Sequence, residues 1–153
     1  MWVIESFAEQ IPVADTPALT AEFVNRAVTE SRKGNDELIE DVEHSVRIGS
    51  RTVPRKLLPL FTALLKEKGT RIQRFGLMGI IHFKAPSSQA PLIEYIKHVN
   101  PRKVEAEWAT DPRHEPEYSY LMMNAAVAVV ILGDIADESA IPFIESLYGI
   151  TVV

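Results

Sequence analysis

The sequence contains no cysteine among its 153 residues. This absence excludes a disulfide framework, thiolate metal ligands and a thiol nucleophile, and it favours a reducing compartment. No window reaches the roughly 18 apolar residues that a membrane span needs. The first residues, Met1 to Glu5, also lack the basic segment that precedes the apolar core of a secretory signal. We therefore expect a cytoplasmic protein with no membrane partner.

The composition is that of an ordinary globular protein, with 46% hydrophobic and 24% charged residues. A chain of this length is long enough to bury a core without cross-links. We expect a single domain over residues 1–153.

Strand-like composition is confined to residues 2–4 and 150–153, at the two ends of the chain. Elsewhere apolar residues recur at helical spacing. The pattern predicts an all-α fold of about seven helices, over residues 16–32, 36–46, 57–68, 71–83, 89–99, 117–132 and 139–148.

Local signals predict where several of these helices begin and end. Thr16 and Pro17 suit the start of the first helix, and Gly34 with Asn35 suits its end and the cap of the next. Gly69 is expected to terminate the helix over 57–68. The segment 117–132 is apolar nearly all round, which predicts a central helix buried on several sides.

Gly76 and Gly79 lie on the apolar stripe of the helix over 71–83. Each glycine costs about 1 kcal/mol of helix propensity relative to alanine. The pattern therefore indicates close approach of a neighbouring helix, in preference to a ligand-binding loop.

Three prolines recur near predicted helix starts, at Pro59, Pro91 and Pro142. The first two are 32 residues apart, within the roughly 20 to 50 residues typical of helical repeats, and the last two are 51 apart. The longer separation predicts an inserted acidic loop at about residues 100–116.

The segment from Leu132 to Ile144, LGDIADESAIPFI, resembles the inter-helix turn of HEAT repeats of the phycobilisome-lyase type. The chemistry agrees with this resemblance. Gly133 suits a left-handed helix end, Asp137 suits a cap, and Pro142 suits a first turn. The resemblance implies a short α-solenoid of antiparallel helix pairs, a scaffold that usually binds a partner.

Charge is distributed in three blocks along the chain. Residues 1–46 hold ten acids and three bases, residues 47–103 hold two acids and twelve bases, and residues 104–153 hold nine acids and one base. In a solenoid, where chain neighbours are spatial neighbours, such blocks become separate surfaces.

The last block combines carboxylates with large aromatic side chains, a composition that suits capture of a basic protein. The candidate partner-binding residues are Glu105, Glu107, Trp108, Asp111, Glu115, Glu117, Tyr118 and Tyr120. We interpret the chain as a non-enzymatic protein-binding module. One hypothesis is an immunity or antitoxin-type inhibitor that neutralises a basic nuclease toxin. Alternatively, Trp108 covers the core and the two tyrosines line the helix pair.

The central bases suggest a nucleic-acid-binding protein as the second hypothesis. They are Arg47, Arg51, Arg55, Lys56, Lys66, Lys68, Arg71, Arg74 and Lys84. Two observations count against it: the flanking blocks are acidic, and no aromatic residues alternate with the bases to stack on nucleotides.

No catalytic motif, metal site or cofactor is expected. The sequence has no phosphate-binding loop, nucleophile elbow or zinc-protease motif. Residues 111–117 place His114 among carboxylates, which more often forms a solvated loop than a metal site. His82 is expected to pack in the fold, and His44 and His98 to lie near helix ends.

Overall fold

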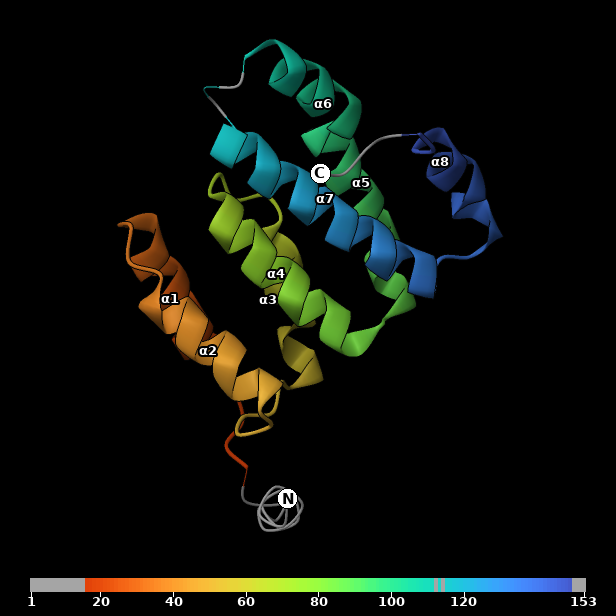
Figure 1. Cartoon of the computed structure of the whole chain (residues 1–153). Helices are drawn as coiled ribbons and strands as arrows, with labels where there is room; N and C mark the ends of the chain where they lie inside the picture. The colour runs from red at the N-terminus through yellow and green to blue at the C-terminus, as the bar shows by residue number, and fades with distance from the viewer. Residues whose placement is uncertain (1–15, 112, 114, 150–153) are drawn as a thin grey trace, which may run out of the picture. The chain divides into compact units, whose positions relative to one another are not determined.

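A computed structural model describes residues 16–111, 113 and 115–149, and these residues form an all-α fold (Figure 1). The predicted fold class is confirmed. In the described part of the chain there is no strand, only an isolated parallel bridge between Ala18 and Thr52. The two segments with strand-like composition lie outside it. The α-helices are α1 (Ala21–Arg32), α2 (Glu37–Arg47), α3 (Leu58–Leu64), α4 (Thr70–Phe83), α5 (Gln89–Val99), α6 (Pro101–Thr110), α7 (Glu115–Ile135) and α8 (Ile141–Ser146).

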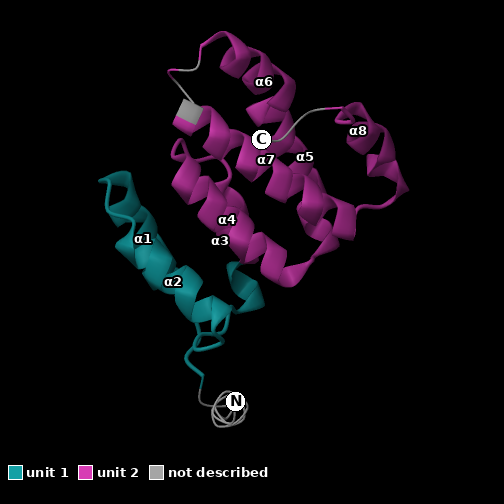
Figure 2. Ribbon diagram, viewed as in Figure 1, with its two compact units in different colours: residues 1–57 teal, residues 58–153 magenta. Residues whose placement is uncertain are grey.

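By its internal contacts the chain divides into two compact units, residues 1–57 and 58–153 (Figure 2). Each unit has buried apolar side chains of its own, such as Val24 and Ile39 in the first and Phe75 and Leu132 in the second. The single domain expected from chain length stays a prediction.

In the first unit, helix α1 begins at Ala21, later than predicted. Thr20 caps it, because its Oγ1 accepts a hydrogen bond from the Phe23 amide at 3.2 Å. The predicted start at Thr16 and Pro17 is wrong. The Pro17 carbonyl instead accepts the amide of Thr52 at 3.0 Å, so this stretch is held in extended backbone.

The turn between α1 and α2 follows the prediction at Gly34. Gly34 has a φ of +90°, a conformation that favours glycine, and its amide donates to the Ser31 carbonyl at 2.9 Å. The predicted cap at Asn35 differs in position: the N-cap of α2 is Asp36, without a side-chain hydrogen bond, and Oδ1 of Asn35, one residue earlier, accepts the Glu37 amide at 3.1 Å.

The second unit begins with the antiparallel pair α3 and α4, in which Phe61 faces Gly79 and Leu64 faces Gly76. A Cβ atom on Gly79 would lie 2.1 Å from Cγ of Phe61, and one on Gly76 would lie 2.7 Å from the Phe61 carbonyl oxygen. The predicted close approach of a neighbouring helix is confirmed. Phe61 is fully buried and packs edge-on against Phe75.

Gly69 does not end the helix before it, contrary to the prediction. Helix α3 already ends at Leu64, where the backbone tightens into a turn through hydrogen bonds such as Glu67 N to Leu64 O at 3.1 Å. Gly69 instead precedes α4 as its N-cap, in extended backbone with a φ of −76°.

The three prolines do lie near helix starts, as predicted. Pro59, Pro91 and Pro142 fall in the first turns of α3, α5 and α8, where no intrahelical donor is needed. Each of these helices directly follows a short 3-10 helix, and the three are η2 (Arg55–Leu57), η3 (Pro86–Ser88) and η5 (Glu138–Ala140). The local structure therefore repeats with the proline pattern.

The predicted inserted loop at residues 100–116 is mostly helical, so that prediction is wrong. Helix α6 occupies Pro101–Thr110. Asn100 both ends α5 and starts α6: it adopts a left-handed conformation with φ +53°, and its side chain accepts the Lys103 amide. Pro101 at the first helical position is pre-organised for this start.

Helix α7 packs against α4, α5 and α6, burying Met122, Ala125 and Ala128. The predicted burial on several sides holds for this face only, because Val130 on the other face is 62% exposed. By length and composition alone, Pro116–Ile135 is apolar enough to cross a membrane, and 33% of its most apolar window is buried in the fold.

Gly133 is helical and not left-handed, so its predicted role at a helix end is wrong. The hydrogen-bond ladder continues past it, with the Ala136 amide donating to the Leu132 carbonyl at 2.8 Å. The predicted cap at Asp137 is confirmed, since its side chain accepts the Ser139 amide at 2.9 Å. Hydrogen bonds from Ser139 and then Gln89 lower the pKa of the Asp137 carboxyl.

Helices α4 and α7 run parallel, side by side (Figure 1). At one end the Asn124 side-chain amide donates to the Thr70 carbonyl at 3.0 Å, and at the other Lys84 lies 3.9 Å from Asp134. Asn124 is buried, so this hydrogen bond satisfies a polar group that would otherwise be costly inside the fold.

A second buried polar contact joins α4 to α5. The Tyr95 hydroxyl donates to Oε1 of Gln73 at 2.8 Å, and Nε2 of Gln73 donates to the Glu67 carbonyl at 2.7 Å. Burial raises the pKa of the Tyr95 phenol to about 12, while hydrogen bonding with Asn124 acts in the opposite direction.

We predict that Gly79→Ala destabilises the fold, because the new methyl group overlaps the ring of Phe61. Overpacking of this kind costs about 1–3 kcal/mol, part of which the better helix propensity of alanine offsets. Gly133→Ala is the matched control, since nothing lies within 4 Å of its added Cβ. It should stabilise the protein by up to about 1 kcal/mol. Urea unfolding of both variants measures the difference, and equal stability of Gly79→Ala and the parent would contradict this packing.

We also predict a loss of stability above pH 10 that depends on Tyr95. Below pH 10 the phenol is neutral in both the folded and the unfolded protein, so its full contribution to the free energy of unfolding is present. Above pH 10 the unfolded phenol ionises first, because the folded pKa is about 12, so up to about 3 kcal/mol is lost as the pH rises towards 12. Tyr95→Phe should show a shallower decline between pH 8 and 11 in urea unfolding. Parallel curves for variant and parent would refute the assignment.

Candidate functional site

Helix α6 and the start of α7 bring together several of the residues predicted to bind a partner. Burial, and then the charges of Glu107, Asp111 and Glu117 in that order, raise the pKa of the Tyr118 phenol. The charges of these three carboxylates therefore all act on one phenol. We call Glu107, Asp111, Glu117, Tyr118 and Tyr120 the acidic surface.

Two basic residues hold carboxylates of the acidic surface in place. Arg113 donates to both oxygens of Asp111, at 2.9 and 3.0 Å, and this contact raises the pKa of the guanidinium. Lys103 lies 3.6 Å from Glu107, one helical turn away. Exposed pairs of this kind contribute about 0–1 kcal/mol each. Their main effect here is positional, and acids still outnumber bases across α6 and the start of α7.

The remaining predicted residues differ in exposure. Tyr120 is 53% exposed, whereas Trp108 and Glu105 are half-buried on α6. Val104, one turn before Trp108, is buried, so α6 packs through this side of the helix. Glu115 begins α7, but its side chain lies outside the described part of the structure. Tyr120 and the carboxylates that act on Tyr118 are therefore the predicted residues best placed to contact a partner.

The sequence interpretation missed an exposed apolar stripe along α7. Tyr120, Met123, Val127 and Val130 follow one another at helical spacing, and Met123 and Val130 are 37% and 62% exposed. Glu117 lies one turn before Tyr120, so the stripe begins at the acidic surface. The apolar composition of the whole helix could have indicated this stripe. A helix that is apolar on every face is either buried all round or exposes an apolar face to which a partner can bind.

The central basic residues are distributed over both units. Several have partners within the fold: the Arg47 guanidinium lies 3.1 Å from Nδ1 of His44, and Arg51 stacks 4.5 Å over the ring of Phe23. Lys84 pairs with Asp134. These contacts weaken the case for a row of bases held ready for phosphates.

The candidate catalytic and metal-binding groups do not converge. His82 is exposed on α4, with its ring edge-on to that of Phe83 and the centroids 5.3 Å apart, so the expectation that it packs in the fold is wrong. His98 is exposed on α5. Among the described residues, no group of three His, Asp or Glu side chains is arranged to hold a metal ion. His114 lies outside the described residues, so the candidate cluster over 111–117 stays an untested prediction.

Comparison with protein-family models, with curated proteins and with solved structures finds no match to this chain. The resemblance to HEAT repeats therefore rests on the segment from Leu132 to Ile144 and stays a prediction. A proposal for the function of this chain therefore depends on the chemistry of its exposed surfaces.

Proposed function

We propose that this chain is a non-enzymatic, cytoplasmic protein-binding module that captures a basic protein through the acidic surface. The observation that carries the proposal is that the charges of Glu107, Asp111 and Glu117 all act on Tyr118, while the exposed ring of Tyr120 lies one helical turn after Glu117 on α7. Aromatic side chains supply contact area at protein interfaces, and carboxylates around them steer an oppositely charged partner into register.

The apolar stripe on α7 extends the proposed interface. An exposed apolar stripe rimmed by charge is typical of a protein-binding site. Ile81 on α4 is 39% exposed and lies one turn before Lys84, which pairs with Asp134, one turn after Val130. Because α4 and α7 are parallel, Ile81 widens the stripe at this end. The partner is thus expected to present apolar side chains next to a basic region.

An inhibitor of a basic nuclease toxin fits this description within the same proposal. A nuclease must expose cationic side chains to bind phosphates. The carboxylates of an inhibitor can pair with these cationic side chains in place of the phosphates. The partner would be held by its apolar contacts along α7 while the acidic surface blocks the phosphate site. An immunity or antitoxin role is the specific form of the proposal.

We predict that the double reversal Glu107→Lys and Glu117→Lys weakens capture about 10- to 100-fold, since charge contacts at interfaces contribute on the order of 1 kcal/mol each. The parent and the variant, each immobilised, are compared for the host proteins they retain. The retained protein is then titrated by calorimetry at low and moderate salt, where the parent affinity should fall with added salt. The matched control, Glu138→Lys with Glu145→Lys, places the same charges on exposed positions elsewhere and should bind as the parent does.

Unchanged affinity after reversal of Glu107 and Glu117 would reject the acidic surface. Retardation of duplex DNA by the parent at low salt, abolished by added salt, would instead favour the nucleic-acid hypothesis.

We further predict that Met123→Ser with Val130→Ser weakens the same complex about tenfold while changing the free energy of unfolding by less than about 1 kcal/mol, because both side chains are exposed in the free protein. Calorimetry and urea unfolding measure the two effects. A large loss of stability without loss of affinity would show that the stripe is structural.

A further inference from the structure

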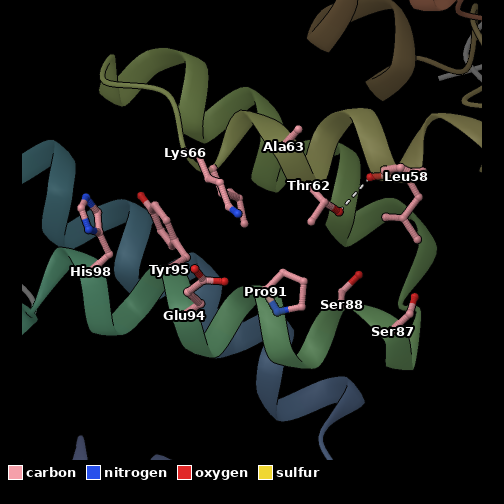
Figure 3. A pocket seen from close by; sticks show the side chains of 12 residues that line it. Leu58, Thr62, Ala63, Lys66, Ser87, Ser88, Pro91, Glu94, Tyr95 and His98 are labelled. Carbon is pink, nitrogen blue, oxygen red and sulfur yellow. Dashed lines mark hydrogen bonds between the residues drawn. The ribbon is translucent and has the colours of Figure 1, made fainter.

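The second unit contains a groove between α3 and α5 with a volume of about 690 Å³ (Figure 3). One wall is formed by α3 and the other by α5 with the 3-10 helix η3. Its apolar lining comes from both walls and includes Leu58, Ala63 and Pro91. A volume of this size matches the sites that hold small organic ligands.

A buried hydroxyl without a partner lies in this groove. Ser88 is 1% exposed, and its Oγ makes no hydrogen bond to any described atom. In Figure 3 this oxygen points from η3 towards the space below α3. Buried polar groups in proteins are nearly always hydrogen-bonded, so an unpaired hydroxyl that lines a groove indicates a ligand that supplies the missing partner.

The groove also carries one charge of each sign on opposite walls. Lys66, in the turn that follows α3, extends towards α5, and Glu94 rises from α5 (Figure 3). Within the described structure no salt bridge is found between them, although both line the same groove. Two opposite charges that face a common space without pairing suit a ligand that carries both signs itself.

We propose that the groove binds a zwitterionic dipeptide with apolar side chains. Its ammonium group meets Glu94, its carboxylate meets Lys66, and its side chains lie against Leu58, Ala63 and Pro91. The peptide group of the ligand supplies the hydrogen-bond partner of Ser88 Oγ. This site is on different helices from the acidic surface, so it is a binding function additional to the proposed capture of a protein.

The probe is the dipeptide L-leucyl-L-leucine, titrated into the full-length protein by calorimetry. Two analogues that keep the peptide group and both side chains test the charges: 4-methylvaleryl-L-leucine lacks the ammonium group and N-isoamyl-L-leucinamide lacks the carboxylate. The dipeptide should bind, and each single-charge analogue should bind at least about tenfold more weakly, the loss expected when a charge-assisted contact is missing. Absence of dipeptide binding at about 10 mM, roughly the weakest affinity expected of a specific site, would overturn the proposal.

Variants locate the ligand within the groove. Ser88→Ala should weaken dipeptide binding about 3- to 10-fold, yet it should leave the melting temperature of the free protein unchanged or raised, because it removes an unsatisfied buried hydroxyl. Ser87→Ala, the control, removes the exposed hydroxyl of the neighbouring residue and should have a smaller effect on binding.

Lys66→Met and Glu94→Gln should each weaken binding about tenfold or more, whereas Lys68→Met, an exposed lysine outside the groove lining, should not. Equal binding by the parent, Ser88→Ala, Lys66→Met and Glu94→Gln would place the dipeptide elsewhere and refute the site. Equal binding of the dipeptide and either single-charge analogue would refute the need for both charges. Neither result bears on the acidic surface, which is tested through Glu107 and Glu117.

Discussion

The direct packing of α7 against α4 is the constraint from which both proposed binding features of the second unit follow. The two helices are tied at one end by the Asn124 amide on the Thr70 carbonyl and at the other by Lys84 and Asp134. Held in this way, α7 has α4, α5 and α6 around its buried face and exposes the stripe through Val130. The same arrangement leaves α3 and α5 facing each other across the groove.

The close packing within the α3–α4 pair has a different physical basis. Gly76 and Gly79 remove the side chains that would separate the two backbones, and the ring of Phe61 occupies the space. The glycines cost helix propensity, but the contact fixes how far the pair can approach. Further along α4, Gln73 binds Tyr95 of α5 through a buried hydrogen bond. Polar groups therefore set the register between helices where apolar packing alone would tolerate sliding.

Some patterns with a local cause were predicted well, but the helix boundaries expected at Thr16, Gly69 and Gly133 were wrong. Patterns that depend on distant partners were not predicted. The cap at Asp137, the turn at Gly34 and the role of Gly79 follow from spacing and backbone chemistry within one or two helices. Helix α6 was missed because it has few apolar residues, with only Pro101 and Val104 fully buried, and because Asn100 with Pro101 resembles the end of a helix as much as the start of another. The buried Gln73 and Asn124, the exposed face of α7 and the groove at Ser88 all depend on how helices far apart in the chain are placed, which periodicity does not encode.

The position of α6 explains why the acidic surface lies where it does. In the α3–α4 pair, five residues (65–69) connect the helices, and the two run antiparallel with little room for other groups. Helices α5 and α7 are also antiparallel, since Gln89 at the start of α5 contacts Asp137 just beyond the end of α7, but α6 is inserted in their connection. Because α6 packs against α7, that insertion brings the charges of Glu107 and Asp111 to act on Tyr118. A short connection between α5 and α7, like the one between α3 and α4, would leave Tyr118 without these carboxylates. The proposed binding chemistry therefore depends on α6, which has no counterpart in the α3–α4 pair.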